Sequence, residues 1–179
     1  MATARVPAPR TPGRYRVGVV CLGNICRSPM AHVVLEQQVA DAGLAHRVEV
    51  VSSGTAGWHV GKPMDHRAAA TLTAAGYDAT RHRARQLEAG WFDDLDLVLV
   101  MDRSNETDVV ALAEQRDDPE TAAHVRMFRD FDPADPGGEV PDPYYGGDEG
   151  FTEVLRMVER TSTALVEALG DALAGSAGP

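Results

Sequence analysis

The 179-residue sequence has the length of one domain with a single sizeable core. Its formal net charge of −10 argues against nucleic-acid binding, because a phosphate backbone requires a basic surface. No apolar run approaches the ~20 residues that span a bilayer, and the N-terminus lacks the apolar core of a secretory signal. We therefore expect a cytoplasmic protein with neither a nucleic-acid nor a membrane partner.

The chain divides into a leader, one domain and a tail. Residues 1–14 are rich in arginine and proline, and we expect them to form a disordered N-terminal leader. Residues 15–170 carry the periodic apolar patterns of a single domain. Residues 171–179 are expected to fray at the C-terminus.

The first half of the domain predicts a strand, a loop, a helix and a second strand. Residues 15–21 form a short valine-rich strand that a Gly-Asn pair ends. The helix covers residues 28–43, because a Ser-Pro pair suits its first turn and a glycine terminates it. A strand over residues 48–52 completes a βαβ unit.

The second half repeats this alternation. The predicted elements are a helix at 65–76, a short helix or turn at 86–92, a strand at 95–101, a helix at 102–115, a strand at 125–128, a loop at 130–150 and a helix at 149–169. This order predicts an α/β fold, a three-layer doubly wound sandwich with a central, mainly parallel four-stranded sheet. Right-handed crossovers place the loop after the first strand at the carboxyl edge of the sheet, where ligands bind.

That loop has the composition of a phosphate-binding loop. Inward-facing N–H groups and the start of the following helix form a cradle for an anion. Gly23 permits the positive φ that such a curl needs, and Asn24 tolerates it better than most residues. Arg27 adds a planar fork that can hold two phosphate oxygens. Cys21, at the end of the strand, is expected to lie beneath the bound phosphorus.

The two cysteines indicate chemistry rather than a disulfide scaffold. Two cysteines are too few to staple a chain of this length, and they suggest a reducing compartment. The role of a small buried hydrophobe suits Cys26 better than Cys21. The positive cradle is expected to stabilise a Cys21 thiolate, which attacks phosphorus to give a cysteinyl-phosphate that water hydrolyses. Ser28 is placed to hydrogen-bond the sulfur.

Several motifs now resemble one family. The run C-L-G-N-I-C-R-S-P-M-A from Cys21 resembles the phosphate loop of the low-molecular-weight protein-tyrosine phosphatases. The family's D-P-Y-Y-G motif stands at residues 142–146. Residues 52–61 (S-S-G-T-A-G-W-H-V-G) resemble its substrate-facing loop, and residues 100–105 (V-M-D-R-S-N) resemble its M-D-x-S-N segment. Order and spacing agree from Tyr15 to Leu169.

This resemblance implies a role for each site residue. Cys21 is the nucleophile, Arg27 the phosphate clamp and Asp142 the general acid. The phosphate loop and its hydrogen-bond network comprise Leu22, Gly23, Asn24, Ile25, Cys26 and Ser28, with Ser52 from the next strand. Trp58 and Tyr144 wall the substrate ring, with Tyr145 adjacent, and Cys26 can form a protective disulfide with Cys21. The resemblance implies phosphotyrosine-containing protein substrates, no cofactor and no metal, and we expect a monomer or weak dimer.

The residues around Asp142 support its assignment on physical grounds. A departing phenolate is assisted by a proton, and the flanking prolines hold the carboxyl rigidly. The two following tyrosines are expected to desolvate it. For Tyr145, ordinary packing against other side chains is an alternative to contact with the substrate. For Asp102 we favour a helix cap over a role in the network at the strand ends.

The histidines are assigned no chemistry. No pair among His59, His66 and His82 shows metal-ligand spacing with a third ligand, and the cysteines are committed elsewhere. We interpret His82 as structural and the other two as surface residues.

Two other functions compete with phosphatase activity. Arsenate reductase chemistry in a similar loop needs resolving cysteines later in the chain, and none follows Cys26. A binding module could hold a phosphate without turning it over, but Cys21, Arg27 and Asp142 are all intact.

Overall fold

The computed structural model describes residues 4–176 and has the expected α/β architecture. Its strands are β1 (Tyr15–Cys21), β2 (Val48–Gly54), β3 (Leu97–Val100) and β4 (Val125–Met127). Its α-helices are α1 (Arg27–Asp41), α2 (His66–Ala74), α3 (Arg103–Ala113) and α4 (Asp148–Gly175). Two short 3-10 helices, η1 (Ala89–Asp93) and η2 (Thr121–His124), precede β3 and β4.

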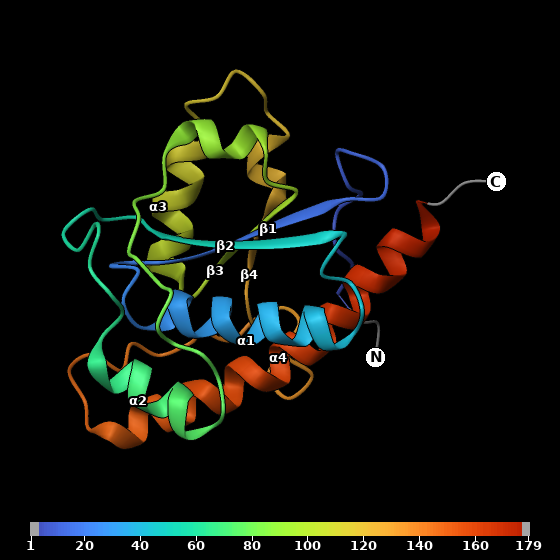
Figure 1. The fold of residues 1–179 in the computed structure, drawn as a ribbon. Coiled ribbons are helices and arrows are strands. Elements are labelled where there is room, and N and C mark those ends of the chain that lie inside the picture. The colour runs from blue at the N-terminus through green and yellow to red at the C-terminus, as the bar shows by residue number, and fades with distance from the viewer. Residues whose placement is uncertain (1–3, 177–179) are drawn as a thin grey trace.

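The four strands form one parallel sheet in the order β2-β1-β3-β4. Helices α1, α2 and α4 lie on one side of the sheet and α3 on the other, which gives three layers (Figure 1). Successive side chains of a strand point to opposite faces. Val17 and Val19 accordingly pack in the core beneath α1 and α4, whereas Val20 packs in the core beneath α3. The predicted doubly wound sandwich is confirmed.

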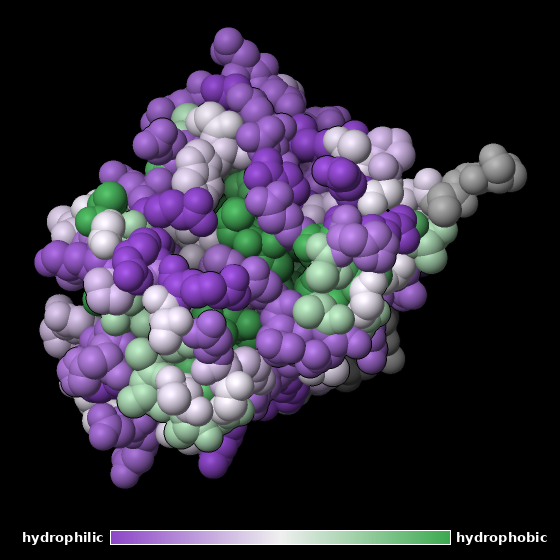
Figure 2. All heavy atoms as spheres, viewed as in Figure 1, coloured by the Kyte–Doolittle hydropathy of each residue, from purple (hydrophilic) through white to green (hydrophobic). Residues whose placement is uncertain are grey.

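Polar side chains cover most of the face seen in Figure 2. Hydrophobic residues show mainly in a central band, which lies near the sheet edge formed by β2. Within residues 4–176, no helix combines the length and the apolar character that crossing a membrane requires.

Two aspartates begin helices at the carboxyl edge of the sheet. Asp65 caps α2 by accepting a hydrogen bond from the Arg67 N–H at 2.8 Å. Asp102 caps α3 by accepting one from the Asn105 N–H at 2.7 Å, which confirms the cap we favoured. Side-chain caps of this kind satisfy N–H groups that the first helical turn leaves unpaired.

The leader is ordered where it is described, so the prediction of disorder is wrong for residues 4–14. Ala4 and Val6 pack against the larger core. The Arg10 N–H donates to the Asp96 carboxylate at 2.7 Å, and the Tyr15 hydroxyl donates to the Pro7 carbonyl at 2.9 Å. Composition does not indicate this order, because the polar groups of the leader bond to partners far away in the sequence. Residues 1–3 lie outside the described residues.

The tail differs from expectation in the same way. Helix α4 continues to Gly175, and Leu173 is fully buried, because the apolar face of the helix extends beyond residue 170. Fraying of residues 171–175 was therefore a wrong prediction, and residues 177–179 lie outside the described residues.

A buried ion cluster anchors the long loop after β4. Asp132 has no exposed surface and accepts hydrogen bonds from Arg129 at 2.9 Å and from Arg160 of α4 at 2.6 Å. Arg129 also donates to the Glu139 carbonyl at 2.8 Å. The Arg160 guanidinium holds the pKa of Asp132 well below its usual range. The cluster thereby fixes the loop on its way to the D-P-Y-Y-G motif.

Replacing Asp132 by asparagine is expected to lower the free energy of unfolding by about 3 kcal/mol at neutral pH, because two buried or half-buried cations lose their counter-charge. Since folding lowers the pKa of Asp132, its contribution is complete above the unfolded value of about 4 and is lost as pH falls below it. Urea denaturation should therefore show that the difference in the free energy of unfolding between wild type and Asp132→Asn shrinks below about pH 4.

Asp135→Asn is the matched control. Its carboxylate also meets Arg129, at 3.1 Å, but its side chain is 61% exposed, so little stability should be lost. Equal losses in the two variants would contradict the role given to the buried cluster.

Candidate active site

The loop after β1 lies against the end of β2. Cys21 is the partner of Gly54 in the parallel register. A side chain at Gly54 would place its Cβ 2.6 Å from the Leu22 carbonyl oxygen and 3.0 Å from the Asn24 nitrogen. Only glycine allows the loop backbone to approach the strand this closely.

Five carbonyls of the loop accept hydrogen bonds from residues outside it. Their donors are Thr55 N–H to Cys21, Ala56 N–H to Leu22, His82 Nε2 to Asn24, Asp65 N–H to Ile25 and Met30 N–H to Cys26. In a trans peptide the next residue's N–H points opposite to the carbonyl. The loop's own N–H groups that follow these carbonyls are therefore directed toward the interior of the loop, as an anion cradle requires.

The positive φ of the loop falls on Asn24, at 56°, and not on Gly23. The buried Asn24 side chain stabilises this conformation from both ends, since its amide donates to Ser28 Oγ at 2.8 Å and its carbonyl accepts from the Arg85 N–H at 2.9 Å. Gly23 serves a different purpose, because a Cβ there would lie 3.1 Å from the ring of His59. His82 has the structural role that we expected, 2.7 Å from the Asn24 carbonyl.

A hydroxyl supports the sulfur of Cys21. Ser28 Oγ lies 3.0 Å from Cys21 Sγ and 3.2 Å from the Ser53 carbonyl oxygen. The strand thus contributes to this network through Ser53. Ser52, which the resemblance placed in the network, instead has its hydroxyl 3.2 Å from Nδ1 of His32. Burial, with the neighbouring His82 next, lowers the pKa of His32 to about 4, so its ring is neutral at physiological pH.

Arg27 begins α1 and its side chain is only 4% exposed. Its Nη1 donates to Asp102 at 2.6 Å and to the Val140 carbonyl at 3.1 Å. Asp102 therefore fulfils both of the roles weighed from the sequence, since one carboxylate oxygen caps α3 and the other binds Arg27. This pairing fixes the guanidinium at the edge of the loop.

Asp142 reaches the same place from the long loop before α4. One carboxylate oxygen accepts from the Tyr144 N–H at 3.1 Å, and the other lies 3.6 Å from Nη2 of Arg27. The expectation that the tyrosines desolvate Asp142 is wrong, because its side chain is 39% exposed and Tyr145 is 91% exposed. The tyrosine rings contact each other edge to face, with centroids 4.9 Å apart.

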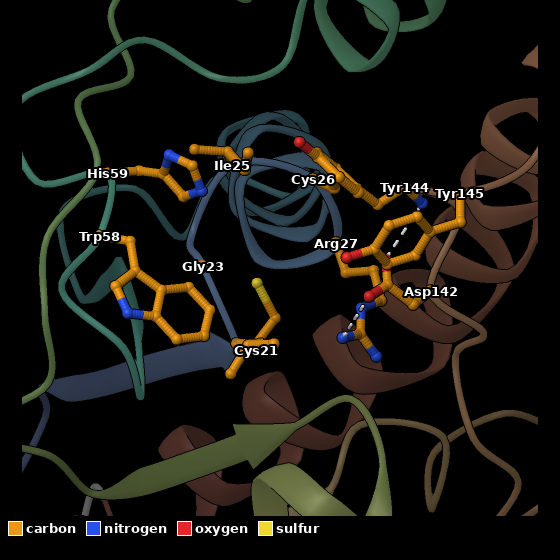
Figure 3. A pocket seen from close by; sticks show the side chains of 11 residues that line it. Cys21, Gly23, Ile25, Cys26, Arg27, Trp58, His59, Asp142, Tyr144 and Tyr145 are labelled. Atoms are coloured by element: carbon orange, nitrogen blue, oxygen red, sulfur yellow. Dashed lines mark hydrogen bonds and ion pairs between the residues drawn. The ribbon is translucent and has the colours of Figure 1, made fainter.

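These side chains surround a pocket of about 280 Å³. It is lined by Cys21, Leu22, Gly23, Ile25, Cys26, Arg27, Trp58, His59, Asp142, Tyr144 and Tyr145. Figure 3 shows Trp58 and His59 on one side, Arg27, Asp142 and the tyrosines on the other, and Cys21 between them. His59 was interpreted as a surface residue, but it lines the pocket beside Gly23, a position that no sequence pattern signals.

Cys26 lines the pocket but does not resemble a nucleophile. Its side chain is buried, and burial, followed by the nearby Asp65 carboxylate, raises the pKa of Cys26 to about 12. It is therefore a neutral thiol at physiological pH, and both cysteines are free. Within residues 4–176, no group of three or more His, Cys, Asp or Glu residues is arranged to hold a metal ion.

A cysteine at the end of the central strand, the curled loop that follows it and a buried arginine at the start of α1 form the kind of site that phosphatases with a phosphate-binding loop have. The family model described as low molecular weight phosphotyrosine protein phosphatase matches residues 16–174. The chain belongs to this family and is a hydrolase of that kind.

Relatives and solved structures agree with this assignment. A low molecular weight protein-tyrosine-phosphatase of Streptomyces coelicolor is 49% identical over 165 residues, 91% of this chain and 98% of its own. Low molecular weight protein-tyrosine phosphatase A of Mycobacterium tuberculosis is 41% identical over 160 residues, 88% of this chain and 93% of its own. The crystal structure of YfkJ from Bacillus subtilis, 30% identical, superposes with a TM-score of 0.81 over 90% of this chain and 98% of its own.

Gly54→Ala should weaken oxyanion binding by at least about tenfold, because the new methyl group collides with loop backbone rather than with a flexible side chain. Calorimetric titration with tungstate measures this affinity. Gly90→Ala is the control, since nothing lies within 4 Å of a Cβ at that position. Unchanged tungstate affinity in Gly54→Ala would show that the loop does not depend on this close approach.

Proposed function

We propose that this protein hydrolyses phosphotyrosine in protein substrates, and aryl phosphates, through a cysteinyl-phosphate intermediate with Asp142 as general acid. The observation that carries the proposal is the position of Cys21. Its sulfur lies 3.0 Å from Ser28 Oγ. In Figure 3 it stands in the pocket between Trp58 on one side and Arg27 and Asp142 on the other.

In the first step, the Cys21 thiolate attacks phosphorus and forms a P–S bond while the bond from phosphorus to the phenolic oxygen breaks. Asp142 transfers its proton to that oxygen, so tyrosine leaves neutral and Asp142 becomes a carboxylate. The inward amides of the loop stabilise the charge on the phosphoryl oxygens.

In the second step, water attacks the cysteinyl-phosphate. The Asp142 carboxylate accepts a proton from the water, the P–S bond breaks, and inorganic phosphate leaves with the Cys21 thiolate regenerated. Ser28 Oγ, 3.0 Å from the sulfur, has one proton, which can turn from the Ser53 carbonyl to the sulfur once Cys21 is a thiolate. That hydrogen bond stabilises the thiolate and makes it a better leaving group in the second step.

Arg27 is the proposed clamp on the phosphoryl group. Its Nη1 is occupied by Asp102 and by the Val140 carbonyl, which leaves the Nε and Nη2 edge of the guanidinium for two phosphoryl oxygens. Because Asp102 fixes the guanidinium beforehand, little conformational entropy is lost when phosphate binds.

The walls of the pocket favour a flat aromatic ester. Trp58 and Tyr144 face the space above Cys21 from opposite sides, as in Figure 3, and both are partly exposed where a protein substrate would approach. Tyr145 stands at the mouth, 91% exposed, and is proposed to contact the substrate chain beside the phosphotyrosine. The relatives from Streptomyces coelicolor and Mycobacterium tuberculosis are protein-tyrosine phosphatases, which supports the same substrate class.

The proposal extends to the setting of the enzyme. Two free cysteines support a reducing, cytoplasmic location, with phosphotyrosine proteins as partners of a monomer or weak dimer. Under oxidants, a Cys21–Cys26 disulfide is proposed to protect the nucleophile from further oxidation. Arsenate reductase activity is disfavoured because no cysteine follows Cys26 to resolve such a bond.

Cys21→Ser should release no p-nitrophenol from p-nitrophenyl phosphate above the uncatalysed rate, because a hydroxyl at this position is a poor nucleophile and leaving group. The wild-type enzyme should be fully active in the presence of EDTA. Tungstate binding by the variant checks that the loop is intact. Turnover that survives in Cys21→Ser would refute the covalent mechanism, and a wild-type protein that binds tungstate without turnover would be a binding module.

Asp142→Ala should lower kcat/KM for phenyl phosphate by about 10²-fold, because the phenolate then leaves without a proton. The loss should be much smaller for 2,4-dinitrophenyl phosphate, whose leaving group needs little protonation. Steady-state kinetics with the two esters measure this contrast. Undiminished activity of the variant toward phenyl phosphate would remove the general-acid assignment.

A further inference from the structure

Arg67, near the start of α2, binds the segment that carries Asp142. Its Nη2 donates to the Tyr144 carbonyl at 3.0 Å and its Nη1 to the Gly146 carbonyl at 3.4 Å. Its guanidinium carbon lies 5.5 Å from the centroid of the Tyr144 ring and 4.8 Å from that of Phe151 in α4. Hydrogen bonds and cation–π contacts therefore hold one cation over this segment.

The same guanidinium is fixed to the phosphate loop through Asp65. The two groups form a bidentate pair, with Arg67 Nε 3.1 Å from Oδ1 and Nη2 3.0 Å from Oδ2. The Asp65 side chain is only 8% exposed, and its N–H donates to the Ile25 carbonyl at 2.8 Å. A continuous series of bonds thus joins the loop around Cys21 to the D-P-Y-Y-G segment.

The peptide of Tyr144 links Arg67 to Asp142. Its N–H donates to the Asp142 carboxylate at 3.1 Å, and its carbonyl accepts from Arg67. The other nearby charge, on Arg27, lies 3.6 Å from Asp142, and the carboxyl is 39% exposed. The flanking prolines restrict the backbone of Asp142 itself, but two glycines follow the tyrosines, so the turn after Asp142 needs outside partners to fix its position.

We infer that Arg67 is a positioning residue, which holds the Tyr144 turn against Asp65 and thereby places the Asp142 carboxyl over the leaving oxygen. This inference rests on the proposed function of Asp142. Arg67 does not itself line the pocket, so it acts through the turn and not on the phosphoryl group. A displacement of the carboxyl by about 1 Å is enough to slow a proton transfer substantially.

The test compares kcat/KM for phenyl phosphate and 2,4-dinitrophenyl phosphate, because kcat/KM reports the step in which the phenol departs. Arg67→Met keeps the length of the side chain and removes its hydrogen bonds. It should lower kcat/KM about tenfold for phenyl phosphate and less than about twofold for the dinitrophenyl ester. Arg67→Lys, which keeps the charge but not the fork, should fall between wild type and Arg67→Met.

Arg116→Met is the matched control. Arg116 also pairs with an aspartate, Asp93, but it follows α3 on the other side of the sheet. Its loss should change kcat/KM for either ester by no more than about twofold. In an Asp142→Ala background, adding Arg67→Met should cost nothing further toward phenyl phosphate, because the group that it positions is gone.

Equal losses toward both esters would overturn the inference, since Arg67 would then shape the pocket and not the acid. So would additive losses in the double variant. If Asp142→Ala shows selective loss and both Arg67 variants do not, the inference fails while the proposed function stands. If Asp142→Ala shows no selective loss, the acid assignment fails and the inference fails with it.

Discussion

One buried guanidinium connects the parts of the site. Arg27 starts α1, yet it binds the carboxylate of Asp102 after β3 and the carbonyl of Val140, two residues before Asp142. A cation with 4% exposure requires partners of this quality, since desolvation without them would be costly. The strand ends and the acid-bearing loop are therefore held together by the residue proposed to bind the phosphoryl group. Folding and substrate recognition depend here on the same interaction.

Much of this arrangement follows from local patterns. The valine-rich run at residues 15–21 became β1, and the apolar run predicted as a strand at residues 95–101 became the shorter β3, because continuous apolar segments suit strands buried on both faces. Alternation of strands and helices then leaves few topologies, and right-handed crossovers bring Cys21 to the carboxyl edge. Asp142 was placed by its motif, since the surrounding loop holds several other acids that composition alone does not distinguish.

What escaped prediction depends on contacts between distant residues. The leader is held through Arg10 by Asp96, 86 residues away, and no leader pattern indicates that partner. Ser53 serves the loop through its backbone carbonyl, which any residue type has, so the run of two serines does not signal it, and the Ser52 side chain instead meets His32. The positive φ fell on Asn24 because Ser28 and Arg85 bind its side chain, a compensation that glycine cannot receive. Arg67 belongs to the same class, because its partners come from a different loop.

The two ends of the described chain lie at the same end of the molecule, away from the pocket (Figure 1). Arg10 binds Asp96 just before β3, and Arg47, just before β2, donates to the Leu173 carbonyl at 3.1 Å, so both ends lie where the parallel strands begin (Figure 1). Cys21 lies where the central strand finishes. A support or a second protein attached through either terminus would leave the pocket mouth facing outward, and large phosphorylated partners could reach it unobstructed.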